Sequence, residues 1–324
     1  MLTRKRVLAA KLETAVGTTI ALAAADGAMN VFDAIMQPTA EFIERMGQSA
    51  FSPLPGVVGA RSGTVSFSVE INGSGVTENI GGESVPAWAE TFLPACGMVN
   101  TLAAKNIFTP LTGAPGVADY GWRTLTIGVY IDGTLRTLSG CMGNARFIFP
   151  AGGIACVEFT FTGIWEAPTT VAIITPDYPV VPPNRFAGST FVLDEDAAAI
   201  VAELTVDLGN EVVLREDGST AGKTSGFNSA VITGRRITGT IDLEGLVAAQ
   251  TLTHTNWLAI GEQAVAWVLN PGTDIGNEQS FAAPKLQFTN LQEGDRNGIV
   301  SNNIEFQLNR SADLGDDEFT ITFT

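Results

Sequence analysis

The chain has 324 residues, of which 45% are hydrophobic and 16% are charged, below the roughly 25% charged share of an average domain. This composition excludes an intrinsically disordered chain, which combines low hydrophobicity with high charge. With 18 basic and 34 acidic residues the formal charge is −16, which disfavours tight binding to nucleic acid or to anionic membranes, since both depend on clustered Lys and Arg.

The chain begins with a basic segment, residues 4–6 (Arg-Lys-Arg), which continues into a short apolar stretch. Lys11 and Glu13 interrupt this stretch, so no secretory signal peptide is expected. A run of about 18 apolar residues is absent from the sequence, so no membrane-spanning helix is predicted.

Period-two alternation predicts β-strands through the first half. Apolar and polar residues alternate over 65–71, 125–131, 147–149 and 155–161, a pattern that places the apolar side chains on one face of a sheet. Asp132 and Gly133 separate two such segments, and this pair readily adopts the positive φ angles of a tight hairpin turn. One short helix is predicted at 86–93, with Pro86 near its start and a second proline just after it.

A proline-rich segment divides the chain into two parts of similar length. Four prolines lie between Thr175 and Arg185, and because proline fixes φ and lacks a backbone donor, this segment is predicted to be an extended linker. We therefore expect a first domain at 1–170, a linker at 171–185 and a second domain at 186–324. The second half repeats the strand pattern at 237–243, 304–308 and 319–323 and contains a helical segment at 256–260.

The two halves also share short sequence matches in the same order, which favours an internal duplication. The matches are 40–42 with 202–204 (offset 162), 144–149 with 303–308 (offset 159) and 158–162 with 318–322 (offset 160).

Two kinds of segment resemble ligand-binding loops without meeting their requirements. A phosphate-binding loop has four residues between its glycines, whereas three separate Gly218 from Gly222, just before Lys223. A surface loop is therefore favoured. The acidic clusters 194–196 and 313–318 lack the alternating ligands and the glycine turn of a calcium site, so solvated acidic surface is favoured there.

Residues able to act in catalysis or to bind metals are few. His254 is the only histidine, and a structural role is favoured over catalysis or zinc binding, for which further partners are needed. The three cysteines are not closely spaced and are typical of buried thiols in a reducing compartment. We therefore predict no catalytic, cofactor-binding or metal-binding residues, no cofactor and no enzymatic activity. The five tryptophans are interpreted as core or interface anchors.

The order of these segments resembles the tail tube (major tail) proteins of long-tailed bacteriophages. The resemblance covers residues 1–166 and extends to the second half through the duplication. The segments that carry it are 13–18 (Glu-Thr-Ala-Val-Gly-Thr), the alternating strand 63–71, the segment 86–97 that begins Pro-Ala-Trp, the strand 125–133 that ends at Asp-Gly, and 140–163.

The resemblance implies a mainly β fold with two tandem tail-tube-like β-sandwich or barrel domains, each with a small flanking helix. It implies a virion structural protein, assembled in the host cytoplasm, whose rings stack into a hollow tube for DNA passage. Three copies with two domains each would form a ring with approximate sixfold symmetry. The implied partners are other copies of the chain and the terminator, tape measure and tail tip proteins, without specific DNA binding or membrane contact.

Contacts between rings are predicted at the N-terminal segment, the first hairpin turn and the loop at 210–230. The residues concerned are Arg4, Lys5, Arg6, Asp132, Gly133, Gly218 and Lys223. The acidic balance predicts a negative tube wall that repels phosphates, with the acids largely from the second half, because residues 171–324 contain 21 acidic and 8 basic residues.

Two alternatives stay open at this point. One is another tail component of related fold, such as a tail-end or baseplate-hub protein. The other is a two-domain carbohydrate-binding module that uses its tryptophans, which the absent signal peptide and the unpaired cysteines disfavour.

Overall fold

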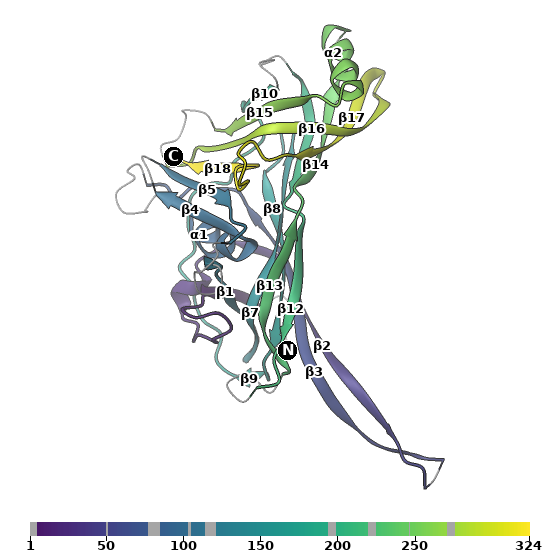
Figure 1. The fold of residues 1–324 in the computed structure, drawn as a ribbon. Helices are drawn as coiled ribbons and strands as arrows, with labels where there is room; N and C mark the ends of the chain where they lie inside the picture. Colours follow the sequence, from purple (N-terminus) through teal and green to yellow (C-terminus); the bar gives the residue numbers. More distant parts are fainter. Residues whose placement is uncertain are drawn as a thin grey trace.

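The computed structural model describes residues 5–49, 51–76, 85–102, 105–113, 121–193, 199–219, 225–245, 247–270 and 276–324. Strands make up 59% of the structure and helices 7%, so the predicted mainly β class is confirmed. Figure 1 shows an elongated body of layered strands, from which one long hairpin extends.

The elements follow one another in a similar sequence in the two halves of the chain. The first half contains β1 (Arg6–Leu12), β2 (Val31–Met46), β3 (Pro53–Glu70), α1 (Ala87–Phe92), β4 (Met98–Leu102), β5 (Asn106–Pro110), β6 (Leu125–Ile131), β7 (Thr134–Pro150), β8 (Cys156–Trp165) and β9 (Thr169–Thr170), with short 3-10 turns at Ala24–Gly27 and Pro94–Cys96. The second half contains β10 (Thr190–Leu193), β11 (Val201–Asp207), β12 (Asn210–Glu216), β13 (Phe227–Arg235), β14 (Thr238–Glu244), α2 (Val247–Leu258), β15 (Glu262–Leu269), β16 (Gln279–Arg296), β17 (Ile299–Leu308) and β18 (Thr320–Phe323).

The strands of the two halves pair in the same order. In the first half the order is β1, β6, β7, β8, β3 and β2. In the second half it is β10, β15, β16, β17, β14 and β11. A short strand then pairs with the start of the third strand in each series, β9 with β7 and β18 with β16. All of these pairs are antiparallel, and α1 and α2 follow β3 and β14 respectively.

This order gives β8 the place that β17 has in the second half. The sequence offset of 160 instead matched residues 158–162 of β8 with 318–322, in and before β18. The register inferred from the sequence is therefore wrong, because short alternating strands resemble one another at several offsets. The duplication itself stays a prediction, which the shared pairing order supports.

One hydrophobic core runs through both halves. Alternation along β3 buries Val65, Phe67 and Val69 on one face. The rings of Phe147 and Phe149 in β7 lie 6.1 and 5.1 Å from the ring of Phe281 in β16, within the range of favourable aromatic contacts. β11 also pairs directly with β7, so the sheet continues from one half into the other.

The proline-rich segment is extended and is anchored at its end. Residues 171–184 belong to no helix or strand. The backbone N–H of Asn184 donates to the carbonyl oxygen of Ile71 (2.8 Å), and its side chain donates to the carbonyl oxygen of Asn277 (2.8 Å). The end of the segment thus contacts both halves, and the division at 170 and 186 stays a prediction.

Most local expectations agree with the structure. Asp132 and Gly133 form the turn between β6 and β7 with φ angles of 42° and 91°, and α1 lies within the predicted 86–93. The helix expected at 256–260 is wrong in its bounds, since α2 begins at Val247 and ends at Leu258. The strand predicted at 65–71 is longer than expected, since β3 begins at Pro53, and it forms a long hairpin with β2 that was not predicted.

Candidate assembly surfaces

Several strands pair on one side only within the described residues, and two of these open edges, on β2 and on the distal part of β16, lie on long strands of the large sheet. Of these two, β2 pairs with β3, and β16 beyond Phe288 pairs with β17. The segment of β7 at 146–148, by contrast, pairs with β8 on one side and β11 on the other. An open edge presents unpaired N–H and C=O groups and favours pairing with another chain.

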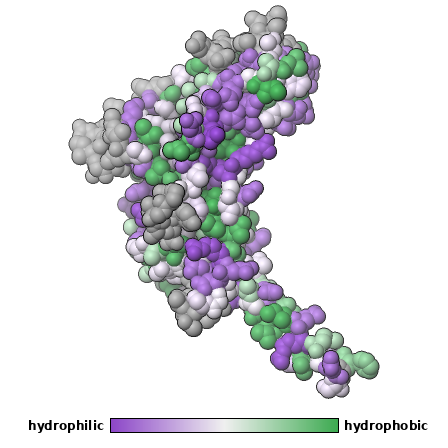
Figure 2. Space-filling model, in the orientation of Figure 1, coloured by the Kyte–Doolittle hydropathy of each residue, from purple (hydrophilic) through white to green (hydrophobic). Residues whose placement is uncertain are grey.

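The distal part of the β2–β3 hairpin extends from the body as a two-stranded ribbon (Figure 1). We call residues 40–46 and 53–61 the protruding hairpin. Phe42 lies opposite Val58 and Ile43 opposite Val57, and alternation places the two pairs on opposite faces of the ribbon. The exposed fractions are 66% and 61% for the first pair and 45% and 50% for the second. Figure 2 shows hydrophobic residues exposed along this hairpin. A lone ribbon is marginally stable in water, so these residues make the hairpin a candidate docking element.

The second half contains a hairpin whose strands, of 7 and 9 residues, have the same lengths as those of the protruding hairpin, and it lies against the first half. We call β12–β13 the folded-back hairpin. Val212 lies opposite Ile232, and Ile232, 8% exposed, packs in a small cluster with Met142 of β7. Trp122 and Val212 are partly buried members of the same cluster. This hairpin thus buries an apolar face on the neighbouring half.

A bend between β11 and β12 brings the folded-back hairpin into this position. β11 pairs with β7 only between Arg146 and Pro150, because from Cys141 towards Thr134 the β7 strand pairs with β6. The chain therefore leaves the plane of the sheet at Gly209. Its φ is +62°, and a Cβ there would overlap the carbonyl oxygen of Arg236, so the bend requires glycine.

Three of the predicted contact residues lie together. Arg6 is opposite Ile131 in the β1–β6 ladder, next to the turn formed by Asp132 and Gly133. Its guanidinium donates to the carbonyl oxygen of Ala34 (2.7 Å) and so helps to hold β2 against the body. Lys5 precedes this strand and is exposed.

Gly218 lies apart from these residues, at the end of β12. The carboxylate of Asp217 accepts hydrogen bonds from the N–H of Ser219 (2.8 Å) and the side chain of Asn228 (3.2 Å), and these bonds lower the pKa of Asp217. Arg4 and Lys223 lie outside the described residues. The role of all these residues in ring contacts stays a prediction.

A buried carboxylate anchors the segment 13–18. Glu13 is 2% exposed and accepts hydrogen bonds from the hydroxyls of Thr124 (2.6 Å) and Thr126 (2.8 Å) and from the N–H of Gly140 (2.8 Å). Gly17 has φ +74° and lies against the backbone of Asn228. This segment therefore ties β1 to β6, β7 and the folded-back hairpin.

Most of the charged residues on the sheet face opposite the core are acidic. We call this face the outer face. Along β11, β14 and β17 its residues alternate with buried ones such as Leu204, Ile241 and Ile304. Arg146 and Arg296 are paired with carboxylates, 3.6 Å from Glu158 and 3.2 Å from Asp242. The acidic residues on this face include Glu158, Glu203, Asp207, Asp242, Glu244 and Glu305.

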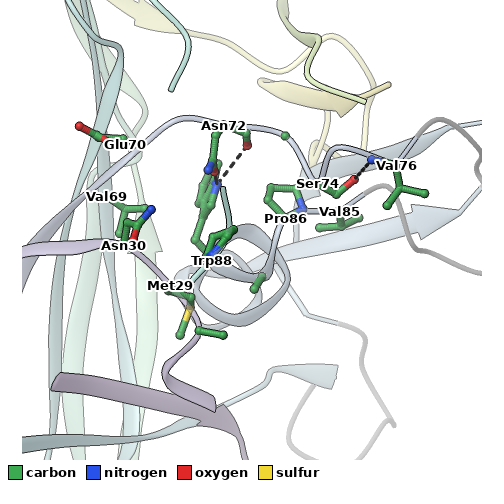
Figure 3. A pocket seen from close by; sticks show the side chains of 14 residues that line it. Met29, Asn30, Val69, Glu70, Asn72, Ser74, Val76, Val85, Pro86 and Trp88 are labelled. Carbon is green, nitrogen blue, oxygen red and sulfur yellow. Dashed lines mark hydrogen bonds between the residues drawn. The ribbon is translucent and has the colours of Figure 1, made fainter. Parts of the chain in front are cut away.

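A cavity of about 260 Å³ lies beside α1 in the first half (Figure 3). Trp88 is 3% exposed, and its indole N–H donates to the backbone and side-chain oxygens of Asn72 (3.2 and 3.0 Å). Glu70 is the one acidic residue in the described lining, which is otherwise polar or apolar and contains no cysteine, histidine or lysine. These residues supply no nucleophile paired with a base.

His254 and two of the cysteines take part in surface contacts or in packing. The His254 ring lies 3.1 Å from the Glu293 carboxylate at the surface. Burial raises the pKa of the thiols of Cys96 and Cys156, as is typical of unreactive packing cysteines. No group of three metal-ligating side chains occurs within the described ranges. Within the same ranges, no helix is both long enough and apolar enough to span a membrane.

Comparison with known proteins gives one family. A family model described as phage tail tube protein matches residues 3–308. No curated protein matches the chain.

Proposed function

Because the chain belongs to the phage tail tube protein family, we propose that its copies assemble into rings that stack into the hollow tube through which phage DNA passes. The protein is a structural component of the phage tail. It performs no enzymatic step in this role, and its partners are further copies of itself and the other tail proteins.

The observation that supports ring formation is that β2 and the distal part of β16 leave open edges on one continuous sheet. Within the chain, β11 of the second half pairs with β7 of the first. In the shared pairing order, β2 of the first half corresponds to β11 of the second half, and β16 of the second half corresponds to β7 of the first half. The equivalent pairing between copies is β2 of one copy with β16 of the next, a head-to-tail contact that closes into a ring when its rotation divides a full turn.

Three chains complete such a ring. The shared pairing order supports two tube domains in each chain, and six tube domains then surround the lumen. The edges that would otherwise invite aggregation are used in ordered contacts.

We assign the outer face to the lumen. Its free carboxylates repel DNA phosphates, whereas a basic wall would bind them through counterion release and slow the DNA. The folded core lies behind this face, so the charge can face the lumen without entering the hydrophobic interior.

Electron microscopy of the purified protein tests the proposal. We expect long tubes of stacked rings in side view and rings of three chains in end view. Rings of six chains would show that the second half is not a second tube domain. A protein that stays monomeric at high concentration, with no ring or tube, would overturn the assembly itself.

A further inference from the structure

We infer that the protruding hairpin of one copy docks on the second half of the neighbouring copy in the same ring, through Phe42 and Val58 against Ile260 and Gln287. This inference rests on the proposed ring and identifies a contact that closes it. The folded-back hairpin, seated on the first half of its own chain, is the template for the contact.

The two hairpins correspond in strand length and in most of their paired positions. β12 spans 210–216, which is 170 residues beyond 40–46, and β13 spans 227–235, which is 174 residues beyond 53–61. The same offsets convert the Phe42–Val58 pair into Val212–Ile232 (212 − 42 and 232 − 58). Val212 and Ile232 form the face that packs on the first half, so Phe42 and Val58 form the docking face of the protruding hairpin.

The receptor is found from a bulge that the two halves share. In β7 the residues Leu138 and Cys141 lie opposite Ile127 and Leu125. In β16 the residues Ala283 and Leu286 lie opposite Val265 and Gln263 with the same irregularity.

Counting from this bulge locates the counterparts of the template's receptor residues. Met142 follows Cys141 as Gln287 follows Leu286, and Trp122 precedes Leu125 by three residues as Ile260 precedes Gln263. Ile260 is 67% exposed, and the side chain of Gln287 donates to its carbonyl oxygen (3.4 Å). The exposed Ile260 and the half-buried Gln287 therefore form one site on the second half.

The strand edge directs the hairpin onto this site. An incoming β2 can pair with β16 only beyond Phe288, since β15 occupies the edge of β16 up to Gln287. The hairpin must then leave the plane of the sheet, as the chain does after β11. The bulge between Ala40 and Phe42 and the glycine at position 63 are the points where the protruding hairpin can bend.

The receptor surface also suits the polar residue on the docking face. Glu44 takes the place of Leu214 in the template. Around Gln287, the amides of Gln307 and Asn309 form a hydrogen-bonded group at 2.9 and 3.1 Å. Both N–H groups of the Gln307 and Asn309 amides are bonded to neighbouring oxygens. The donor left for the Glu44 carboxylate is the second N–H of the Gln287 amide, whose first N–H is bonded to Ile260, whereas the template's receptor has the apolar Met142 at this place.

The first test compares two faces of the same hairpin. Phe42→Ser with Val58→Ser removes the docking face, and Ile43→Ser with Val57→Ser removes the opposite face by the same change on exposed residues. We expect the first variant to reduce the fraction of chains in rings at least about tenfold, the scale of losing one interface hot spot, while the second still forms rings. Rings from the first variant at wild-type yield would overturn the inference.

The second test joins the contact covalently. Val58→Cys with Gln287→Cys, oxidised after ring formation, should give cross-linked species up to the size of a whole ring on a non-reducing gel. Val57→Cys with Gln287→Cys is the matched control and should give none. Equal cross-linking by the two variants, or cross-links between stacked rings only, would overturn the inference while leaving the proposed tube intact. Absence of rings from the wild-type chain would instead reject the proposed function.

Discussion

At the scale of single residues, Glu13 supports the fold through hydrogen bonds alone. Its buried carboxylate satisfies two threonine hydroxyls and the N–H of Gly140. Replacing it by alanine leaves buried donors without an acceptor, a change that costs several times the net value of one hydrogen bond. The motif that suggested a family resemblance in the sequence is therefore a structural anchor.

We expect Glu13→Ala to lower the free energy of unfolding by about 3 kcal/mol, measured by denaturant unfolding of the subunit. Glu13→Gln is the control, because its amide oxygen still accepts from Gly140 and the hydroxyl of Thr124 can turn to accept from the amide nitrogen. A loss in the alanine variant no larger than in the glutamine variant would contradict this role.

At the scale of elements, the bend at Gly209 determines where the folded-back hairpin lies. We expect Gly209→Ala to destabilise the protein by about 1–3 kcal/mol, since it forces a side chain into a left-handed conformation against the carbonyl of Arg236. Gly218→Ala on the same hairpin is the control, because a Cβ there meets no atom within 4 Å.

Thermal unfolding measures the stability lost in Gly209→Ala. The fluorescence of Trp122, which lies in the cluster under the folded-back hairpin, reports whether that hairpin is displaced. Equal stability of the two variants would show that the bend tolerates other residues.

The sequence predicts the strands that alternate strictly and the β6–β7 hairpin, but it does not predict the protruding hairpin. The β6–β7 hairpin was predictable because Asp132 and Gly133 have a specific turn chemistry. The protruding hairpin was not, because its bulges at 40–42 and 43–45 break the period of two on which strand prediction depends.

The docking residues were missed for a related reason. Phe42, Ile43, Val57 and Val58 are adjacent apolar residues on both faces of a ribbon, a pattern that by sequence alone resembles a buried strand. Only the structure shows that these residues lie on an exposed two-stranded ribbon, which makes them a candidate interface. A register for the predicted duplication likewise comes only from the pairing order of the strands.

At the scale of the whole molecule, the outer face predicts how the assembled tube treats DNA. Glu203→Lys with Glu305→Lys should leave assembly intact and make tubes retain short duplex DNA at low salt, with retention falling steeply between about 50 and 200 mM salt. Co-sedimentation of labelled DNA with the tubes measures this. Asp177→Lys with Asp313→Lys makes the same change in net charge away from the outer face and should not retain DNA. Equal retention by both variants would place the lumen on another face.

In the single subunit the protruding hairpin extends away from the body (Figure 1), whereas its template is folded back on the first half. If docking requires the same bend, the first contact between two free copies must deform the ribbon for the gain of a single docking face, so initiation is unfavourable. Each later addition also completes contacts with neighbours that are already in place. Growth would then show a lag and a critical concentration, and a preformed end would set where elongation starts.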